Sequence, residues 1–481
     1  MNDTAMMRSF VIKLNKKTIA PIAVLAVIVV LVVIFSAAGV SEKKSEVNLF
    51  YSPEENGAVF FEDDKISSDV IPAASVSVVK YSEDKSSCCI LAAVGSSYNL
   101  YYVKNGEYTL ICEGAANRFA IDYTGSTAIF YDNSGTLKRY TASGGKIREI
   151  ASGSDKFAVS PDGESIIYNV NESGTDTLYL YRNGSSTEIG TGYTPVAVSD
   201  SCKYIYVIGN SDNSLCVLDS GGSMKSKLCT DISAGTVMFS EDIKTVVFSD
   251  GEYTYMSDEG KSRVRFCEGQ ASPVVNESFS VTCDSENTAR IYSSENLCDM
   301  YYSVSNNDGT SVLFYIDKNG ERTDIDEMAE NMIVTDKNEI IFLNSGGTVC
   351  SFSKGSLSEL VSGAADVRCT ADGKYIYYLN SSDELYALKK GESVKIAAGV
   401  EKFYVTNKDI LLFIMQNGDL YASEKQEYGE LIDSNVYSCL CTGNAAFYYK
   451  DYSVNTGYFD LYSSDGSENF TLSAEKISWI M

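Results

Sequence analysis

A pattern of short β-strands recurs along residues 47–481 with a period of about 38 residues. The period can be measured on one anchor residue, which opens the third strand of each unit and is usually followed by Tyr and, about six residues later, by Gly. Eight of the nine intervals between anchors fall between 35 and 41 residues, and the interval from Tyr253 to Phe314 exceeds one period by about 23 residues. The ten anchors are Leu100, Leu137, Leu178, Leu215, Tyr253, Phe314, Val349, Leu385, Leu420 and Leu461.

Every unit has the same internal order: strand, turn, strand, polar turn, strand, Gly turn, strand. Asp162-Gly163 and Asp372-Gly373 mark the first turn, where a tight reversal needs a positive φ that Gly adopts without a side-chain clash. The segment after this turn, such as residues 375–379, is rich in β-branched and aromatic residues, as strands are. Four short strands in about 35 to 45 residues are typical of a propeller blade. We therefore predict an all-β protein, a β-propeller of four-stranded blades.

The turns SPDG, SEDI and TADG, each followed by an I-x-Y or V-x-F strand and then by L-Y, resemble those of the TolB-type and WD-repeat-like β-propeller families. The resemblance covers most of residues 75–474 and implies the propeller fold. These families include scaffolds, receptors and non-catalytic domains attached to hydrolases, so the resemblance implies no single function. The sequence departs from eukaryotic-type WD repeats because it has no Gly-His and no Trp-Asp pair, and Trp479 is its only Trp.

The two ends of the repeat region look like parts of one blade. Residues 474–481 resemble the first strand of a blade, and residues 47–70 contain two further strands. A blade built from both ends would tie the repeat region shut and remove exposed sheet edges, which predicts that the ends pair. The alternative is that both ends are frayed partial blades.

The number of units is high for a propeller. Ten anchors and a shared terminal blade make eleven units, whereas propellers typically have four to eight blades. We expect two rings of five or six blades, with the split near residues 270–300, where the repeat is broken. The alternative is a single large ring with a long inserted loop at the same place.

Residues 18–41 are free of charged side chains and consist mostly of Ala, Val, Ile and Leu. At about 1.5 Å per residue, a helix of this length spans the roughly 30 Å of bilayer hydrocarbon. The residues that follow, 42–46, carry no net charge, whereas the preceding segment is basic and places the N-terminus in the cytoplasm by the positive-inside rule. The basic residues of that segment are Arg8, Lys13, Lys16 and Lys17.

We therefore predict a short cytoplasmic tail (1–17), a transmembrane signal-anchor helix (18–41), a linker (42–46) and an extracytoplasmic β-propeller region (47–481). The protein is then a single-pass protein of the cell membrane. A cleaved secretory signal is the alternative, because residues 36–38 are small, as a signal peptidase requires. The apolar stretch is longer than the 7 to 15 residues of a typical signal, which favours the anchor.

The formal net charge of −26 restricts the partners. Such a surface repels phosphate backbones and anionic lipid headgroups, so we predict no nucleic-acid partner. Cationic partners remain open, and so does Ca²⁺, although the sequence contains no D-x-[DN]-x-[DN]-G loop. Residues 323–327, TDIDE, are interpreted as a solvated turn.

The chain contains no histidine. This absence excludes Ser-His-Asp and Cys-His catalysis, HExxH zinc chemistry and any His-ligated metal. The sequence also lacks G-x-S-x-G, a P-loop and a dinucleotide fingerprint in strand-helix context. We predict no catalytic, cofactor-binding or metal-binding residue and no cofactor, and we leave the ligand-binding residues unassigned. A glycosidase needs only two carboxylates about 5 to 10 Å apart, and the 65 acidic residues leave that alternative open.

Cysteine and tyrosine are interpreted mainly as core residues. None of the 13 cysteines forms C-x-x-C, and most lie in strand segments, where a free thiol behaves as a small hydrophobe. Neighbouring residues on a strand point to opposite faces, so each tyrosine pair should place one ring between blades and one at the other sheet face. The alternative for these rings is a carbohydrate or peptide platform. The pairs are Tyr101-Tyr102, Tyr301-Tyr302, Tyr377-Tyr378 and Tyr448-Tyr449.

These observations predict a membrane-anchored, extracytoplasmic β-propeller that acts as a non-catalytic binding or scaffold protein for a protein or glycan partner. The alternative is a carboxylate-dependent surface glycosidase or another carbohydrate-active enzyme, whose acidic side chains should converge on the central channel. A signalling receptor is a weaker alternative, because 17 cytoplasmic residues hold no domain that could pass on a signal.

Overall fold

Residues Ser45–Met481 form one compact unit of the computed structural model, separate from Met1–Lys44. The predicted transmembrane segment, 18–41, lies outside the described residues. Among the residues that are described, no helix is long and apolar enough to cross a membrane. The structure describes residues 46–52, 57–62, 65–66, 70–232, 237–274, 279–280, 290–294, 296–307, 309–424, 427–442, 445–464 and 469–479.

The described chain is built from strands, and its one helical element is a 3₁₀ turn, η1 (Ala142–Gly144). Six units are plain four-stranded sheets whose strands pair in chain order. Their strands are β5 (Ser75–Tyr81), β6 (Ser87–Val94), β7 (Ser97–Lys104) and β8 (Glu107–Glu113); β9 (Ala115–Ile121), β10 (Thr127–Asp132), β11 (Thr136–Thr141) and β12 (Lys146–Ser152); β13 (Ser154–Val159), β14 (Ile166–Glu172), β15 (Thr175–Arg182) and β16 (Ser185–Thr191); β17 (Tyr193–Val198), β18 (Ile205–Gly209), β19 (Ser214–Leu218) and β20 (Met224–Cys229); β34 (Ala364–Cys369), β35 (Ile376–Asn380), β36 (Glu384–Lys389) and β37 (Glu392–Ala398); and β38 (Val400–Val405), β39 (Ile410–Met415), β40 (Leu420–Glu424) and β41 (Glu430–Asp433).

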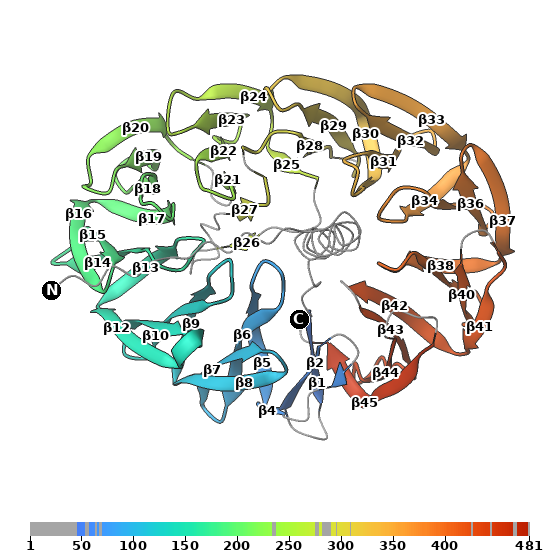
Figure 1. Ribbon diagram of the computed structural model, residues 1–481, viewed down its shortest axis with the longest axis horizontal. Helices are drawn as coiled ribbons and strands as arrows, with labels where there is room; N and C mark the ends of the chain where they lie inside the picture. Colours follow the sequence, from blue (N-terminus) through green and yellow to red (C-terminus); the bar gives the residue numbers. More distant parts are fainter. Residues whose placement is uncertain are drawn as a thin grey trace, which may run out of the picture. The chain divides into compact units, whose positions relative to one another are not determined.

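Two larger sheets occupy the middle of the chain (Figure 1). One has the order β24-β23-β22-β21-β27-β26, and the next has the order β25-β28-β29-β30-β31-β32-β33. In the second sheet β30 serves two units, because its first part pairs with β29 and its second part pairs with β31. The strands are β21 (Met238–Ser240), β22 (Thr245–Ser249), β23 (Tyr253–Asp258), β24 (Val264–Glu268), β25 (Ala271–Pro273), β26 (Phe279–Ser280), β27 (Arg290–Tyr292), β28 (Met300–Ser305), β29 (Ser311–Ile316), β30 (Arg322–Val334), β31 (Ile340–Leu343), β32 (Thr348–Ser353) and β33 (Ser356–Ser362).

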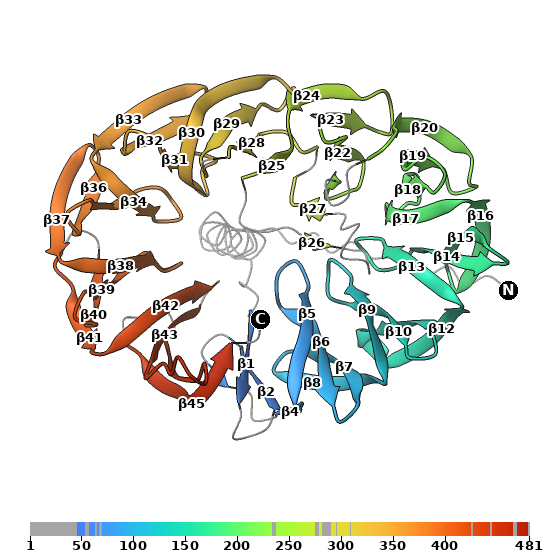
Figure 2. The same cartoon turned by 180° about the vertical axis from the view of Figure 1, so that it is seen from behind.

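The last sheet combines both ends of the repeat region, as the complementary ends predict. Phe50 of β1 pairs with Trp479 of β45, and Tyr51 pairs with Ser478. The earlier part of β45 pairs with β44, so the final strand begins at Thr471, before the predicted 474. Figures 1 and 2 both show β1 and β2 between β45 and β5. The strands are β42 (Val436–Thr442), β43 (Ala445–Lys450), β44 (Phe459–Ser464), β45 (Thr471–Trp479), β1 (Val47–Ser52), β2 (Gly57–Glu62), β3 (Lys65–Ile66) and β4 (Ile71–Pro72).

The sequence period corresponds to the sheets. Each of the ten anchors lies in the third strand of its unit, on β7, β11, β15, β19, β23, β29, β32, β36, β40 or β44. Nine of the ten are completely buried, and Tyr253 is partly exposed. The prediction of four-stranded, blade-type sheets is therefore confirmed. Gly163 and Gly373 have φ values of +72° and +68°, as the first turn of each unit requires.

The long interval in the repeat is an insertion within one unit. β25 and β28 flank it and pair with each other, and between them the chain adds β27 and β26 to the preceding sheet. β27 runs parallel to β21. Met238 and Val247 of the preceding sheet also share a hydrophobic cluster with Phe314 of the next sheet. This strand pairing fits the inserted-loop alternative, and the number of rings stays a prediction.

Seven of the eight paired tyrosines are buried, as predicted, and Tyr449 is partly buried against a core cluster. Tyr101 and Tyr102 are each 4% exposed and belong to two different hydrophobic clusters. The other three pairs are divided in the same way, with one ring in each of two clusters. Successive side chains of one strand thus fill the packing layers on both sides of its sheet.

Candidate functional site: a cavity at the first turns of four units

The first turns of four units contain the same network of polar contacts. In the sheet β13–β16, Asp162 Oδ1 accepts hydrogen bonds from Ser160 Oγ (2.5 Å) and from the backbone N–H of Glu164 (2.9 Å). Ser160 Oγ in turn accepts the backbone N–H of Ser165 (3.0 Å), and Ser160 is completely buried. The aspartate of the SPDG turn therefore holds the turn itself. Equivalent pairs are Ser82 with Asp84, Ser240 with Asp242 and Thr370 with Asp372.

Hydrogen bonds also join the first turns of neighbouring units. The backbone N–H of Tyr123 donates to the carbonyl oxygen of Pro161 (3.1 Å). The backbone N–H of Asp162 donates to Asp200 Oδ1 of the next unit (3.0 Å). These bonds fix the first turns of three successive units relative to one another.

A cavity of about 620 Å³ opens where four of these turns meet the insertion. The turns β9–β10, β13–β14, β17–β18 and β21–β22 supply most of its wall, and the segment between β27 and β28 supplies Asn296. That segment is fixed to the β21–β22 turn, because the backbone N–H of Glu241 donates to the carbonyl oxygen of Ser294 (3.2 Å). We call this site the turn cavity; its lining residues are Tyr123, Thr124, Pro161, Asp162, Asp200, Glu241, Asp242, Lys244 and Asn296.

The turn cavity carries an excess of negative charge. Four carboxylates line it together with one ammonium group, Lys244, which also lies 3.6 Å from Asp258 and 3.9 Å from Glu259. Partial removal from water, together with the neighbouring Asp162 carboxylate, raises the pKa of Asp200 to about 6. Burial raises the pKa of Tyr123 to about 12, and the Glu83 and Glu241 carboxylates add to this shift. A positively charged group in the cavity would relieve this repulsion.

The sequence identified Asp162 only as a turn residue, and no carboxylate of the turn cavity was assigned a binding role. One usable signal was present, namely acidic residues one or two positions after the Ser that begins each of three turns. The other was the broken repeat, whose inserted segment forms one wall. Convergence of carboxylates is the feature that the glycosidase alternative requires, so that alternative stays open.

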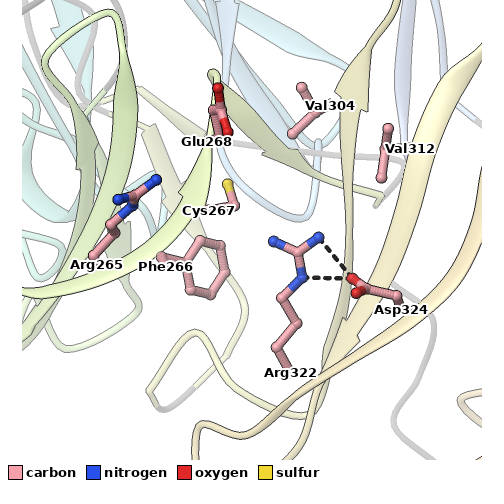
Figure 3. A pocket seen from close by; sticks show the side chains of 8 residues that line it. All are labelled: Arg265, Phe266, Cys267, Glu268, Val304, Val312, Arg322 and Asp324. Atoms are coloured by element: carbon pink, nitrogen blue, oxygen red, sulfur yellow. Dashed lines mark hydrogen bonds and ion pairs between the residues drawn. The ribbon is translucent and has the colours of Figure 1, made fainter.

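A second cavity, of about 630 Å³, lies between β24 and the strands β28–β30. Figure 3 shows its lining, in which Arg322 is hydrogen-bonded to Asp324 at 2.6 Å. The Arg322 guanidinium also lies over the ring of Phe314, 4.1 Å from the ring centre. Two arginines, Arg265 and Arg322, face two carboxylates, Glu268 and Asp324, so the charges of this wall balance and we assign the cavity no function.

The predicted cysteine and calcium features can be placed in the structure. Twelve cysteines lie in the described residues and are free, and burial raises the pKa of thiols such as Cys88, Cys369 and Cys439. Residues 323–327, interpreted as a solvated turn, belong instead to the strand β30, because one long strand serves two units. Within the described ranges, no group of three His, Cys, Asp or Glu residues is arranged to hold a metal ion.

No protein-family model matches this chain, and no curated protein does. Similar solved structures include the tricorn protease, with 9% identity and a TM-score of 0.32 over 89% of this chain and 57% of that chain. TolB from Acinetobacter baumannii has 16% identity and a TM-score of 0.29 over 47% of this chain and 64% of its own. The putative TolB from Agrobacterium tumefaciens has 14% identity and a TM-score of 0.31, covering 47% of this chain and 91% of that chain.

The chain thus covers less than two thirds of the length of the tricorn protease and of the first TolB. The class of the protein is defined by its own strand pairing, as an all-β repeat of four-stranded, blade-type antiparallel sheets.

Proposed function

We propose that the repeat region is a non-catalytic binding module, tethered to the cell membrane by residues 18–41, and that the turn cavity binds a basic segment of a protein partner. The observation that carries the proposal is the convergence of four carboxylates from three units in one cavity of about 620 Å³. A Lys or Arg side chain of the partner would neutralise part of this charge and let Asp200 ionise more readily.

The break in the repeat supports the same site. Regular repeats depart from their pattern at a cost, and such departures are expected at functional positions. Here the insertion adds Asn296 to the cavity wall and fixes the backbone of Glu241 through Ser294. Glu241 is an exposed residue within this wall, so its carboxylate is well placed to meet a partner.

The local bonding of the aspartates favours binding over catalysis. Asp162 and Asp242 each use Oδ1 to hold a Ser hydroxyl and a backbone N–H of their own turn. A general acid or base must instead release and accept protons at that carboxylate. These two residues are therefore better suited to shaping the cavity than to proton transfer.

A carboxylate-dependent glycosidase is the second candidate, and one observation favours it. Asp200 holds a proton at higher pH than an ordinary aspartate, and Asp162 lies directly beside it. Glycoside hydrolysis uses two carboxyl groups, one of which must hold a proton near neutral pH. In this candidate Asp200 is the general acid.

Binding and product formation should be measured together on the purified full-length chain. Lys-rich and Arg-rich peptides, with Ala-substituted peptides as matched ligands, test binding, and a glycan panel tests turnover. We expect basic peptides to bind, with an affinity that falls as salt rises from about 50 to 500 mM, since screening weakens charge pairing. Glu241→Gln should weaken binding by about threefold to tenfold, whereas the exposed Asp231→Asn should change it less than twofold.

Two outcomes would contradict the proposal. If basic peptides bind the Glu241→Gln variant as tightly as they bind the parent, the turn cavity is excluded as the binding site. Turnover of a glycan that disappears in Asp200→Asn but persists in Asp231→Asn would establish the glycosidase instead.

A further inference from the structure

A third cavity, of about 360 Å³, has a basic lining, whereas the lining of the turn cavity is acidic. It is formed between the hairpin β11–β12 of one sheet and the strands β13–β16 of the next. Three cationic side chains and one carboxylate line it, in a chain whose net charge is −26. We call it the basic pocket; its lining residues are Arg139, Thr141, Ser143, Gly144, Lys146, Arg148, Glu164 and Tyr181.

The register of the hairpin places the cations on one face. Arg139 on β11 is directly opposite Arg148 on β12, and Thr141 is directly opposite Lys146. Alternate residues of a strand share a face, so all four side chains lie on the same side of the hairpin. Two like charges directly opposite each other destabilise an antiparallel pair, and an anion between them would reverse that effect.

The pairing of these cations within the protein is incomplete. Arg139 Nη2 lies 2.7 Å from Glu164 Oε1, and Arg139 Nε is buried without a hydrogen-bond partner among the residues that the structure describes. Arg148 makes one long contact, 3.5 Å from Nη1 to the hydroxyl of Tyr181. Because Arg148 is exposed, its guanidinium can offer further N–H donors to a ligand.

The neighbouring sheet leaves room for the Arg148 guanidinium. Gly184, in the β15–β16 turn, has a φ of +81°, and a Cβ atom there would lie 2.9 Å from Arg148 Nη1. The hydroxyl groups of Thr141, Ser143 and Tyr181 line the same space. Donors thus reach the pocket from both strands of the hairpin, from η1 and from the next sheet.

We propose that the basic pocket binds a phosphate or sulfate group. Guanidinium forks and an ammonium group are the donors that such oxoanions prefer. Donors that approach from several directions suit an ion whose oxygens point in several directions, and a net lining charge of two positive units suits a doubly charged anion. The volume is at the small end for ligand sites, which fits one anionic group better than a large ligand.

The test uses isothermal titration of the purified full-length chain with inorganic phosphate, inorganic sulfate and glucose 6-phosphate, in chloride buffer of constant ionic strength. We expect saturable binding of at least one of them below about 10 mM. Stronger binding of the monoester would identify an esterified group as the ligand, and stronger binding of an inorganic ion would identify the free ion. Either result supports the basic pocket.

Variants then locate the binding. Arg148→Gln and Lys146→Gln change exposed side chains, so both should fold, and each should weaken binding by about tenfold or more. Lys318→Gln, which removes one exposed charge elsewhere, is the matched control and should stay within twofold of the parent. Glu241→Gln, in the turn cavity, should also leave anion binding unchanged, which separates this proposal from the proposed function.

The inference is overturned if the parent protein shows no saturable binding of any of the three probes up to about 20 mM. It is equally overturned if Arg148→Gln and Lys146→Gln, with far-UV circular dichroism spectra like that of the parent, bind phosphate or sulfate as the parent does.

Discussion

At the scale of single residues, a positive φ restricts the residue type at one position of the chain, whereas a cavity depends on side chains that only the packed sheets bring together. Gly163 and Gly373 were identified from the Asp-Gly pairs, because a positive φ leaves few residue types to choose from. The gathering of Tyr123, Asp200 and Glu241 in one cavity could not be predicted, since these residues come from three units and meet only through the packing of whole sheets. Acidic residues one or two positions after the turn Ser can be read from the sequence, but they do not indicate which side chains meet.

Asp200 offers a test at this scale. Its pKa is raised in the folded protein, so the stability that its protonation provides is present below the unfolded pKa of about 4 and is lost as pH rises through about 6. Asp200→Asn keeps an oxygen that can accept the Asp162 N–H but cannot ionise. We expect this variant to melt above the parent at pH 7.5, with a smaller difference at pH 5.

Asp231→Asn is the control for Asp200→Asn, because Asp231 is exposed and carries the same charge. The raised pKa of Asp200 would be contradicted by an increase in melting temperature that is equal in both variants. It would also be contradicted by an increase in Asp200→Asn that does not depend on pH.

At the scale of elements, the repeat predicts strands because each unit buries the same positions. The anchor of every unit lies in a third strand, and each tyrosine pair divides its rings between two clusters. β26 and β27 were missed, since they occur once and have no period, and β27 joins the sheet through β21, a strand far away in sequence. Residues 323–327 were misassigned because acidic residues of an exposed strand have the same composition as those of a turn.

The joint between β1 and β45 offers a test at this scale. Deleting residues 474–481 removes the Phe50–Trp479 and Tyr51–Ser478 pairing and also Ile477, which is 1% exposed and packs with Phe50. We expect the free energy of unfolding to fall by at least about 2 kcal/mol, since a large buried side chain and a strand pairing are both lost. Chemical denaturation of the two proteins measures the difference.

Leu472→Ala is the control for this deletion, because Leu472 is on the same strand and is 46% exposed. It should change the free energy of unfolding by less than about 0.5 kcal/mol. A truncated protein that unfolds within that margin of the parent would show that the final strand does not fasten the two ends.

At the scale of the whole molecule, composition sets the expectations that the described residues do not test. The net charge of −26 and the uncharged stretch 18–41 predict an acidic region held outside the cell membrane. The acidic net charge does not extend to every part of the surface, because Arg139, Lys146 and Arg148 form a local basic cluster. Average charge predicts long-range repulsion and cannot predict such a cluster, which depends on strand register.

Membrane topology can be tested on intact cells. Protease added from outside should degrade the repeat region and leave a membrane stub that contains residues 1–41, because the basic residues before the apolar stretch retain the N-terminus in the cytoplasm. Immunoblotting with a tag at the N-terminus detects the stub. Full protection of the repeats, in cells where a known surface protein is digested, would contradict the predicted orientation.

β30 gives the molecule a property that separate sheets would lack. One uninterrupted strand, Arg322–Val334, forms the outer ladder of one unit up to Ala329 and the first ladder of the next from Glu330 onward. If β30 separates from its partner strand in one unit, the same strand is displaced in the other unit. Thermal fluctuations that open one unit are therefore transmitted along the backbone to its neighbour, so the two units should exchange their amide hydrogens as a single cooperative block.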